Sequence, residues 1–218
     1  MKKLALLHTV TFLADLLKPK LAQRYPGLEF FNLVDESLLK DLLAAGGLTP
    51  AIVRRAAGHA FSAREAGAGV ILFTCSSTSP AVDLVRPLLE VPILKIDDPM
   101  AAKAVSLGNR IGVVCTVKTT QEASRSLIES HAAQAGKKIK VSMALVEEAF
   151  KAVLAGDKAR HDQLVGEAVA RLSRENEVVV LAQASMAHLA PGLSQSLKAT
   201  VLASPDLCMD ALEGLLKD

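Results

Sequence analysis

The chain has 218 residues and half of them are hydrophobic, which is enough to bury a core in one large domain or two small ones. Only 3% of the residues are aromatic, and 25 basic residues nearly balance 23 acidic ones without a basic stripe, which argues against nucleic-acid binding. The three cysteines, Cys75, Cys115 and Cys208, show no metal-ligand spacing and are odd in number. We therefore expect no metal, no disulfide framework and a reducing, cytoplasmic compartment.

The N-terminal apolar run is short. Leu4–Leu7 is interrupted at once by His8, Thr9 and Thr11, and then by Asp15, and no clear cleavage site follows. No stretch of the chain reaches the roughly 18 apolar residues that a membrane span needs. The pattern predicts a buried strand followed by a loop and a helix, rather than a signal peptide or a membrane partner.

Short apolar runs alternate along the chain with longer amphipathic segments. The apolar runs predict strands at Leu4–Leu7, Glu29–Val34, Gly69–Phe73, Ile93–Ile96, Ile111–Cys115, Ile139–Ser142 and Val178–Leu181, with a weaker eighth at Thr200–Leu202. The amphipathic segments predict helices at Ser37–Ala45, Pro50–Glu65, Pro80–Leu89, Pro99–Leu107, Thr120–Gln134, Leu145–Leu154, Asp157–Glu175 and Pro205–Leu216.

The strand–helix alternation favours an α/β fold. Continuous Val, Ile and Leu strands indicate burial on both faces, hence a doubly wound parallel sheet. Thr49-Pro50 and Ser79-Pro80 each place a capping hydroxyl before a proline in a first helical turn, and Asp97-Asp98 before Pro99 reads as a helix cap. Gly67 and Gly136 stand where helices should end.

A faint internal repeat divides the chain. Residues 4–10 resemble residues 111–117, and residues 70–77 resemble residues 178–185. The spacings agree, with 66 residues from Thr9 to Cys75 and 67 from Thr116 to Gln183. Chance similarity among strands is the alternative explanation. The repeat predicts two pseudo-symmetric α/β lobes, with residues 1–97 and 203–218 in the first and residues 98–202 in the second.

Polar residues follow four of the predicted strands. They form the loops His8-Thr9, Cys75–Thr78, Cys115–Thr120 and Gln183–Ser185. In open α/β sheets, ligands bind beyond the carboxyl ends of the strands. We therefore expect these loops to face each other across a cleft between the lobes.

The segment after the third strand carries the clearest chemistry. It reads Thr74-Cys75-Ser76-Ser77-Thr78-Ser79-Pro80 and leads into a helix. A thiol near a helix N-terminus and free backbone N–H groups is stabilised as a thiolate, and the same donors can hold a carboxylate. This combination suits proton transfer at a carbon next to a carboxylate, with Cys75 as acid/base. The alternative is a cysteine that is simply buried at a strand end.

His8 is the second catalytic candidate, although a hydrogen-bonded structural histidine fits its place as well. Cys115 and Cys208 read as packing residues, and His188 faces either the cleft or solvent. The predicted substrate-binding residues are the hydroxyls and the amide of the four loops: Thr9, Ser76, Ser77, Thr78, Thr116, Thr119, Thr120, Gln183 and Ser185.

Three segments resemble the aspartate/glutamate/hydantoin racemase superfamily. They are Phe73–Ser77, where the family has a cysteine motif after a strand; Arg110–Thr119, which matches the pattern R-I-G-V-x-x-T-x-x-T; and Val179–Ala184, where the family has V-x-L-G-C-T. The resemblance spans nearly the whole chain. It implies two lobes with the site between them, no cofactor, a small carboxylate substrate and a homodimer.

The resemblance also implies two thiols on opposite faces of the substrate, but Gln183 stands at the second thiol position. An amide is neither an acid nor a base near neutral pH. Three hypotheses follow. The chain is a racemase or isomerase that uses Cys75; or a decarboxylase or lyase that uses the single thiol as proton donor; or a carboxylate-binding protein without catalytic activity.

Overall fold

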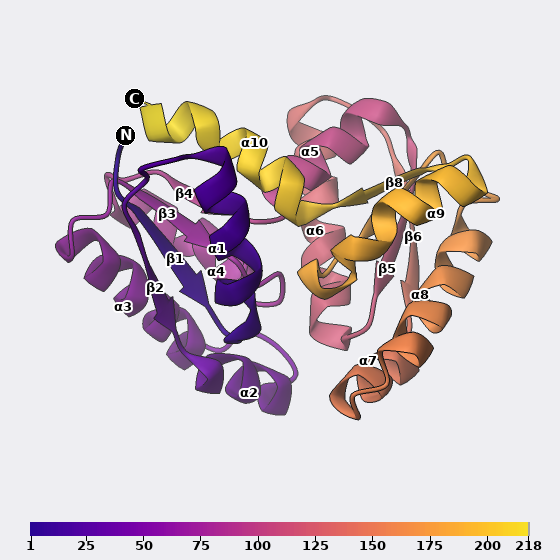
Figure 1. The fold of residues 1–218 in the computed structure, drawn as a ribbon, viewed down its shortest axis with the longest axis horizontal. Coiled ribbons are helices and arrows are strands. Elements are labelled where there is room, and N and C mark those ends of the chain that lie inside the picture. Colours follow the sequence, from indigo (N-terminus) through magenta and orange to yellow (C-terminus); the bar gives the residue numbers. More distant parts are fainter. Residues whose placement is uncertain (218) are drawn as a thin grey trace. The chain divides into compact units, whose positions relative to one another are not determined.

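The computed structural model describes residues 1–217, which form two compact units. One comprises Met1–Ile96 and the C-terminal segment from Asp206, and the other comprises Asp97–Pro205. Each unit is an α/β structure around its own parallel sheet (Figure 1). Within residues 1–217, no helix is both long and apolar enough to cross a membrane.

The first sheet has the strand order β2-β1-β3-β4, and every neighbouring pair is parallel. Its strands are β1 (Leu4–His8), β2 (Phe30–Val34), β3 (Val70–Phe73) and β4 (Ile93–Lys95). Every residue of β1 and β3 is buried, as expected of central strands covered on both faces.

The second sheet repeats this topology, with the order β6-β5-β7-β8 and all pairs parallel. Its strands are β5 (Arg110–Cys115), β6 (Lys140–Leu145), β7 (Val178–Leu181) and β8 (Thr200–Ala203). Each strand of the first sheet therefore has a counterpart four strands later in the chain, as the internal repeat predicts.

Helices cover the sheets and complete the alternation. In the first unit they are α1 (Phe12–Arg24), α2 (Glu36–Ala45), α3 (Pro50–Glu65), α4 (Pro80–Val85) and the 3₁₀ turn η1 (Arg86–Leu88). In the second they are α5 (Asp98–Leu107), α6 (Lys118–Gln134), α7 (Glu147–Leu154), α8 (Lys158–Leu172), the 3₁₀ helix η2 (Ala184–Leu189) and α9 (Ala190–Leu197). The last helix, α10 (Ser204–Lys217), lies almost entirely in the first unit.

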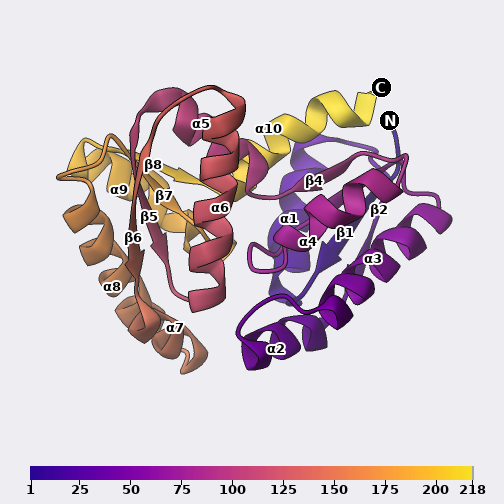
Figure 2. The same cartoon turned by 180° about the vertical axis from the view of Figure 1, so that it is seen from behind.

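The first sheet buries both of its faces. Ala5 and Leu7 on β1 pack with Ile71 and Phe73 on β3 against α2, α3 and α4. Side chains alternate along a strand, so Leu6 and its neighbours project from the opposite face, where α1 and α10 lie (Figure 1). Figure 2 shows α3 and α4 covering the sheet from behind.

The second sheet is built in the same way. Val114, Val179 and Leu181 pack with residues of α7, α8, η2 and α9 in one aliphatic cluster. Helices α5 and α6 contact β7 and β5 respectively and cover the other face (Figure 2). The predicted α/β fold with doubly wound parallel sheets is confirmed.

Several predicted boundaries were wrong. The strand expected at Ile139–Ser142 continues to Leu145, which was assigned to a helix, because the apolar run Met143–Leu145 pairs with β5. The helix expected at Pro80–Leu89 ends at Val85 and continues as η1. Helix α9 was not predicted at all.

Some of the predicted helix caps and helix ends agree with the structure, and others do not. Thr49 accepts a hydrogen bond from Ile52 N, and Gly67 and Gly136 adopt positive φ where their helices end. The capping role of Ser79 was wrong, since its backbone is already helical and its side chain makes no cap hydrogen bond. Asp97 does not cap α5 either; its buried carboxylate accepts a hydrogen bond from Ser204 Oγ.

Candidate active site

Each sheet has one topological switch point, which lies between two adjacent strands whose onward connections run to opposite sides of the sheet. In the first sheet this point lies between β1 and β3, because the chain passes from β1 to β2 on one side and from β3 to β4 on the other. Ligands of open α/β sheets bind beyond the carboxyl ends of the strands at such points. His8 and Thr9 at the end of β1, and Thr74 and Cys75 after β3, stand at this place.

Cys75 is the most accessible of the three cysteines. Its exposed fraction is 9%, whereas Cys115 and Cys208 are completely buried. The turn that follows is held by a hydrogen bond of 3.3 Å from Thr78 Oγ1 to Cys75 O. Helix α4 has only 6 residues and is shorter than the helix predicted for Pro80–Leu89.

Hydroxyl groups surround this end of the first sheet. The side chains of Ser76, Ser77 and Thr78 are buried, and so is that of Thr9. Among residues 1–217, no hydrogen-bond partner is found for Thr9 Oγ1. An unpartnered buried hydroxyl costs roughly 1–3 kcal/mol. A ligand atom that bonded this hydroxyl would remove that cost.

His8 connects three strands. Its Nδ1 lies 2.8 Å from Thr74 Oγ1 and its Nε2 lies 2.8 Å from Asn32 Oδ1 on β2. Thr74 Oγ1 also donates to Leu7 O at 3.0 Å. Burial lowers the pKa of His8, partly offset by the hydrogen bond with Asn32. A buried ring whose two nitrogens both have hydrogen-bond partners suits a positioning role better than proton transfer.

The switch point of the second sheet lies between β5 and β7. Thr116 follows β5 and Gln183 stands two residues after β7. Both donors of Thr116, its backbone N–H at 2.6 Å and its hydroxyl at 2.9 Å, bond to Gln183 Oε1. The structure therefore brings these two predicted residues together.

The other predicted residues of the second unit lie close to Thr116 or Gln183 in the chain. Thr119 and Thr120 belong to the first turn of α6, and Thr120 is buried. Ser185 lies in η2 and its carbonyl is 3.1 Å from His188 Nδ1. Cys115 is fully buried, as predicted, and burial raises the pKa of its thiol to about 12.

Sequence reasoning missed the groups that hold these residues. Asn32 is the one polar residue within the apolar strand Phe30–Val34, which was a usable signal. In the second unit, Asp162 accepts from two histidines, His161 Nδ1 at 2.7 Å and His188 Nε2 at 3.0 Å. Burial alone would raise the pKa of Asp162, but these hydrogen bonds outweigh it and lower the pKa.

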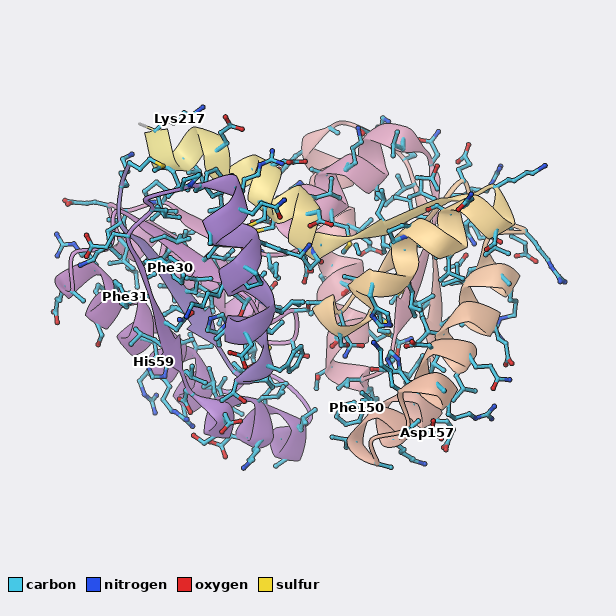
Figure 3. All side chains as sticks on the ribbon, viewed as in Figure 1. Phe30, Phe31, His59, Phe150, Asp157 and Lys217 are labelled. Carbon is cyan, nitrogen blue, oxygen red and sulfur yellow. The ribbon has the colours of Figure 1, made fainter. Side chains whose placement is uncertain are left out.

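A second polar cluster in the first unit follows β2. Asp35 Oδ2 bonds to Arg55 at 2.6 Å and to His59 at 2.8 Å. His59 is labelled in Figure 3. Burial would raise the pKa of Asp35, but hydrogen bonds from Ser37, His59 and Arg55 hold it well below its usual range. Asp35 N donates to His8 O at 2.9 Å, which ties this cluster to the end of β1.

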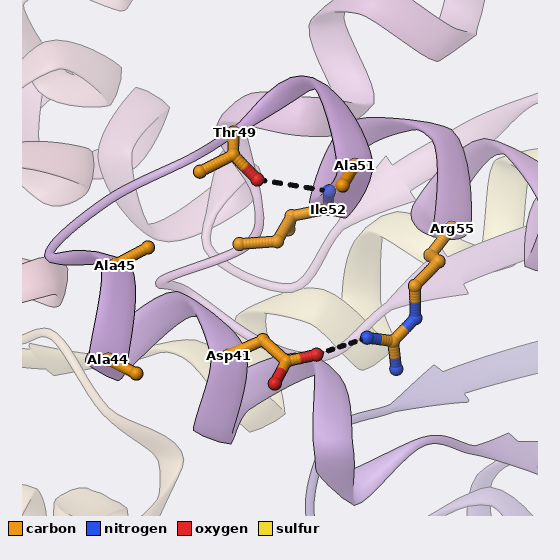
Figure 4. Close-up of a pocket in the computed structure, with 7 residues that line it drawn as sticks. All are labelled: Asp41, Ala44, Ala45, Thr49, Ala51, Ile52 and Arg55. Carbon is orange, nitrogen blue, oxygen red and sulfur yellow. Dashed lines mark hydrogen bonds and ion pairs between the residues drawn. The ribbon is translucent and has the colours of Figure 1, made fainter.

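An open hollow of about 440 Å³ lies between α2 and α3 (Figure 4). It is lined by Asp41, Ala44, Ala45, Thr49, Ala51, Ile52 and Arg55. Arg55 is already paired with both Asp41 and Asp35, so it offers no free charge to a ligand. Within residues 1–217, no group of three or more His, Cys, Asp or Glu side chains is arranged to hold a metal ion.

The whole arrangement has known counterparts. The family model for Asp/Glu/Hydantoin racemase matches residues 21–212. The chain belongs to this racemase family. No curated protein matches the chain in sequence. Membership supports a racemase-type function and an isomerase activity.

Solved structures of racemases share the fold of this family member. Allantoin racemase from Klebsiella pneumoniae is 17% identical with a TM-score of 0.73, covering 100% of this chain and 88% of that one. Glutamate racemase from Francisella tularensis, solved with D-glutamate, is 14% identical with a TM-score of 0.76, covering 99% and 81%. Unliganded arylmalonate decarboxylase is a weaker match, 12% identical with a TM-score of 0.59, covering 99% and 93%.

Proposed function

We propose that this protein is a cofactor-independent racemase or isomerase that moves the proton at a carbon next to the carboxylate of a small acid. Cys75 is the acid/base group. The observation that carries the proposal is that Cys75, the least buried of the three cysteines, and Thr9, whose buried hydroxyl has no partner among residues 1–217, both follow central strands at the switch point of the first sheet. Family membership supports the same reaction class.

The register of the first sheet supports a common place for Thr9 and Cys75. Leu7 pairs with Phe73, and Thr9 and Cys75 each follow two residues later, beyond the ends of β1 and β3. Proton removal next to a carboxylate builds negative charge on the carboxylate oxygens, and hydroxyl and N–H donors stabilise it. Thr9 and Ser76 supply hydroxyls for this role.

His8 supports the site without taking part in proton transfer. Its ring fixes Thr74, the residue before Cys75, and joins it to Asn32. A thiol acid/base has to be held within a fraction of an ångström of the reacting carbon. We assign His8 to positioning, the alternative that its place at a strand end had left open.

Solvent deuterium exchange tests the proposal. The protein is incubated in D2O with L-glutamate, L-aspartate or allantoin, and loss of the hydrogen signal at the carbon that racemises is followed by NMR. We expect exchange with at least one substrate, lost in Cys75→Ala and kept in Cys208→Ala, whose residue is fully buried in α10. Equal exchange by Cys75→Ala and the unmodified protein would show that Cys75 is not the base.

A decarboxylase is the second candidate. It is favoured by Gln183 at the second thiol position and by the fold shared with arylmalonate decarboxylase. Such an enzyme needs a single proton donor after C–C cleavage, and Cys75 would fill that role. Release of CO2 from a panel of substituted malonates, absent in Cys75→Ala, would favour this candidate over the racemase. Thermal stabilisation by these acids without exchange or CO2 release would instead indicate a binding protein.

A further inference from the structure

One edge of the second sheet brings together basic residues that are far apart in the sequence. In a parallel sheet the amino ends of all strands lie at the same edge. At this edge, the segments 108–110, 135–140, 171–177 and 198–200 lead into β5, β6, β7 and β8. Their acidic residues are Glu175 and Glu177 alone. Their lysines and arginines, all exposed, form what we call the basic edge: Arg110, Lys137, Lys138, Lys140, Arg171, Arg174 and Lys198.

The strand register aligns the starts of the four strands. Arg110 and Lys140, the first residues of β5 and β6, are direct partners across the two strands. Val178 at the start of β7 is likewise level with Thr200 at the start of β8. Neighbouring strands are about 4.8 Å apart, and like charges held this close repel each other. All of these residues belong to the second unit, so their arrangement does not depend on the first.

Most of this charge is not neutralised by the protein itself. Lys137 Nζ donates to Val105 O at 2.7 Å, and Arg110 Nε donates to Glu175 O at 3.0 Å. The other side chains of the basic edge have no hydrogen bond or ion pair within residues 1–217: Lys138, Lys140, Arg171, Arg174 and Lys198. The basic edge therefore presents positive charge that is available to a partner.

The first unit is an internal control, because the same topology forms the amino edge of its sheet. Helices end at this edge in both units, and cations near helix C-termini interact favourably with the helix dipole. In the first unit, however, acidic residues accompany the cations. Lys3 pairs with Glu29 at 2.6 Å, and Arg64 pairs with Glu90 at 3.4 Å. The shared fold therefore does not explain the excess of positive charge in the second unit.

An exposed leucine lies within the basic edge. Leu107 is the last residue of α5, just before β5 begins, and is 47% exposed. Lys137 reaches the same helix end through its bond to Val105 O. The single aromatic residue of the second unit, Phe150, lies in α7, which follows the carboxyl end of β6. The basic edge thus offers cations and an aliphatic side chain, but no ring on which a nucleic-acid base could stack.

We propose that the basic edge is a docking surface for an anionic lipid bilayer. Lysine and arginine side chains are attracted to anionic headgroups, and an exposed aliphatic side chain can enter the boundary between headgroups and acyl chains. The sequence shows no basic stripe because these residues are spread from Arg110 to Lys198, and only the sheet brings them together. The basic edge lies at the opposite ends of the strands from Thr116 and Gln183, and the inference does not rest on the proposed function.

Sedimentation with lipid vesicles tests the proposal. At low ionic strength the full chain should bind vesicles of phosphatidylcholine mixed with phosphatidylglycerol, and should not bind vesicles of phosphatidylcholine alone. This binding should be lost in about 1 M salt, where charges are screened beyond about 3 Å. Absence of binding to the anionic vesicles at low ionic strength would overturn the proposal.

Charge-removing variants identify the surface that binds. Lys138→Gln combined with Arg174→Gln should lower the partition coefficient by at least about tenfold, since each cation near an anionic bilayer contributes about fivefold. The matched control is Lys158→Gln combined with Arg160→Gln, which removes the same charge from the first turn of α8, at the other end of that helix from Arg171. It should change the coefficient far less. Equal losses in the two double variants would reject the basic edge as the surface.

A leucine variant separates a bilayer from a nucleic acid. Leu107→Gln keeps every charge and should weaken binding to the anionic vesicles, because its apolar side chain no longer enters the interface. The unfolding midpoint of each variant verifies that it is folded. Binding of duplex DNA at a lower protein concentration than the vesicles require, unaffected by Leu107→Gln, would assign the surface to nucleic acid and overturn the proposal.

Discussion

The two units have the same strand order, yet the ends of their central strands carry opposite chemistry. In the first unit, the His8–Thr74 link leaves Cys75 and the Thr9 hydroxyl unbonded to each other. In the second unit, the Thr116–Gln183 link uses the donors at the corresponding position. Moving the inter-strand link by one residue thus decides which donors at a switch point are satisfied by the chain itself.

The largest expected effect separates the two units by their thiols. Cys75→Ser should lower the deuterium-exchange rate by about 10²- to 10⁴-fold, the usual contribution of an acid/base group. Cys115→Ser should change it by no more than a few-fold, because that thiol is fully buried and packed at the end of β5. Exchange rates at saturating substrate, with circular dichroism to verify folding, make the comparison. Similar losses in both variants would break it.

The second effect concerns the two threonines, whose replacement by valine should change stability in opposite directions. Thr9→Val removes a buried hydroxyl that has no partner among residues 1–217 and should raise the free energy of unfolding by roughly 1–3 kcal/mol. Thr116→Val removes a bond to Gln183 and should lower it by about 1 kcal/mol. Urea unfolding measures both. Destabilisation by Thr9→Val would mean that its hydroxyl has a partner in solution.

The third effect is the pH at which each unit loses stability. Burial lowers the pKa of His8, so the unfolded chain binds a proton more readily, and stability falls as pH drops below about 6.5 toward the lowered value. Burial raises the pKa of Cys115 from 9.0 to about 12, so stability falls as pH rises between these values.

Urea unfolding from pH 5 to pH 11 should resolve these two slopes. His8→Gln should flatten the acid side only, and Cys115→Ala should flatten the alkaline side only. The slope, rather than the absolute stability, is the quantity to compare, since both substitutions also alter packing. An acid slope that persists in His8→Gln would show that other groups cause it.

The smallest effect tests a feature that the units share. Asp35 and Asp162 are each bonded to a histidine and have lowered pKa values despite partial burial. A lowered carboxyl pKa stabilises the fold above the unfolded value of 3.8, and this contribution is lost as pH falls toward the folded value. Replacing either with asparagine should cost up to about 1 kcal/mol at pH 7 and less at pH 3. A cost that does not shrink in acid would point to packing instead.

Much of the architecture could be predicted because it follows from local patterns. Runs of Val, Ile and Leu indicate the buried strands and the repeat. Gly67 and Gly136 indicate helix ends, where the structure gives both a positive φ. Helix α9 was not predicted, although Pro191 stands in its first turn, where proline is tolerated.

The candidate site was predictable only in part. Position after a strand was enough to select Cys75, Thr116 and Gln183. The bond between Thr116 and Gln183 joins residues 67 positions apart and depends on the register of β5 with β7. The same limit hid the partners of His8, because hydrogen bonds between strands are set by the sheet rather than by the neighbouring sequence.

The path of the chain through the first unit has a consequence for biosynthesis. This unit is interrupted in sequence, since its C-terminal part begins at Asp206, after the whole second unit. Lys2 N donates to Leu216 O at 3.0 Å, and Tyr25 Oη donates to Met209 O. During synthesis, the whole second unit leaves the ribosome before α10, whereas the first unit is complete only after α10 has been made. We therefore expect the unit that contains Cys75 to fold last. A chain that is truncated before α10 should fold only in the second unit.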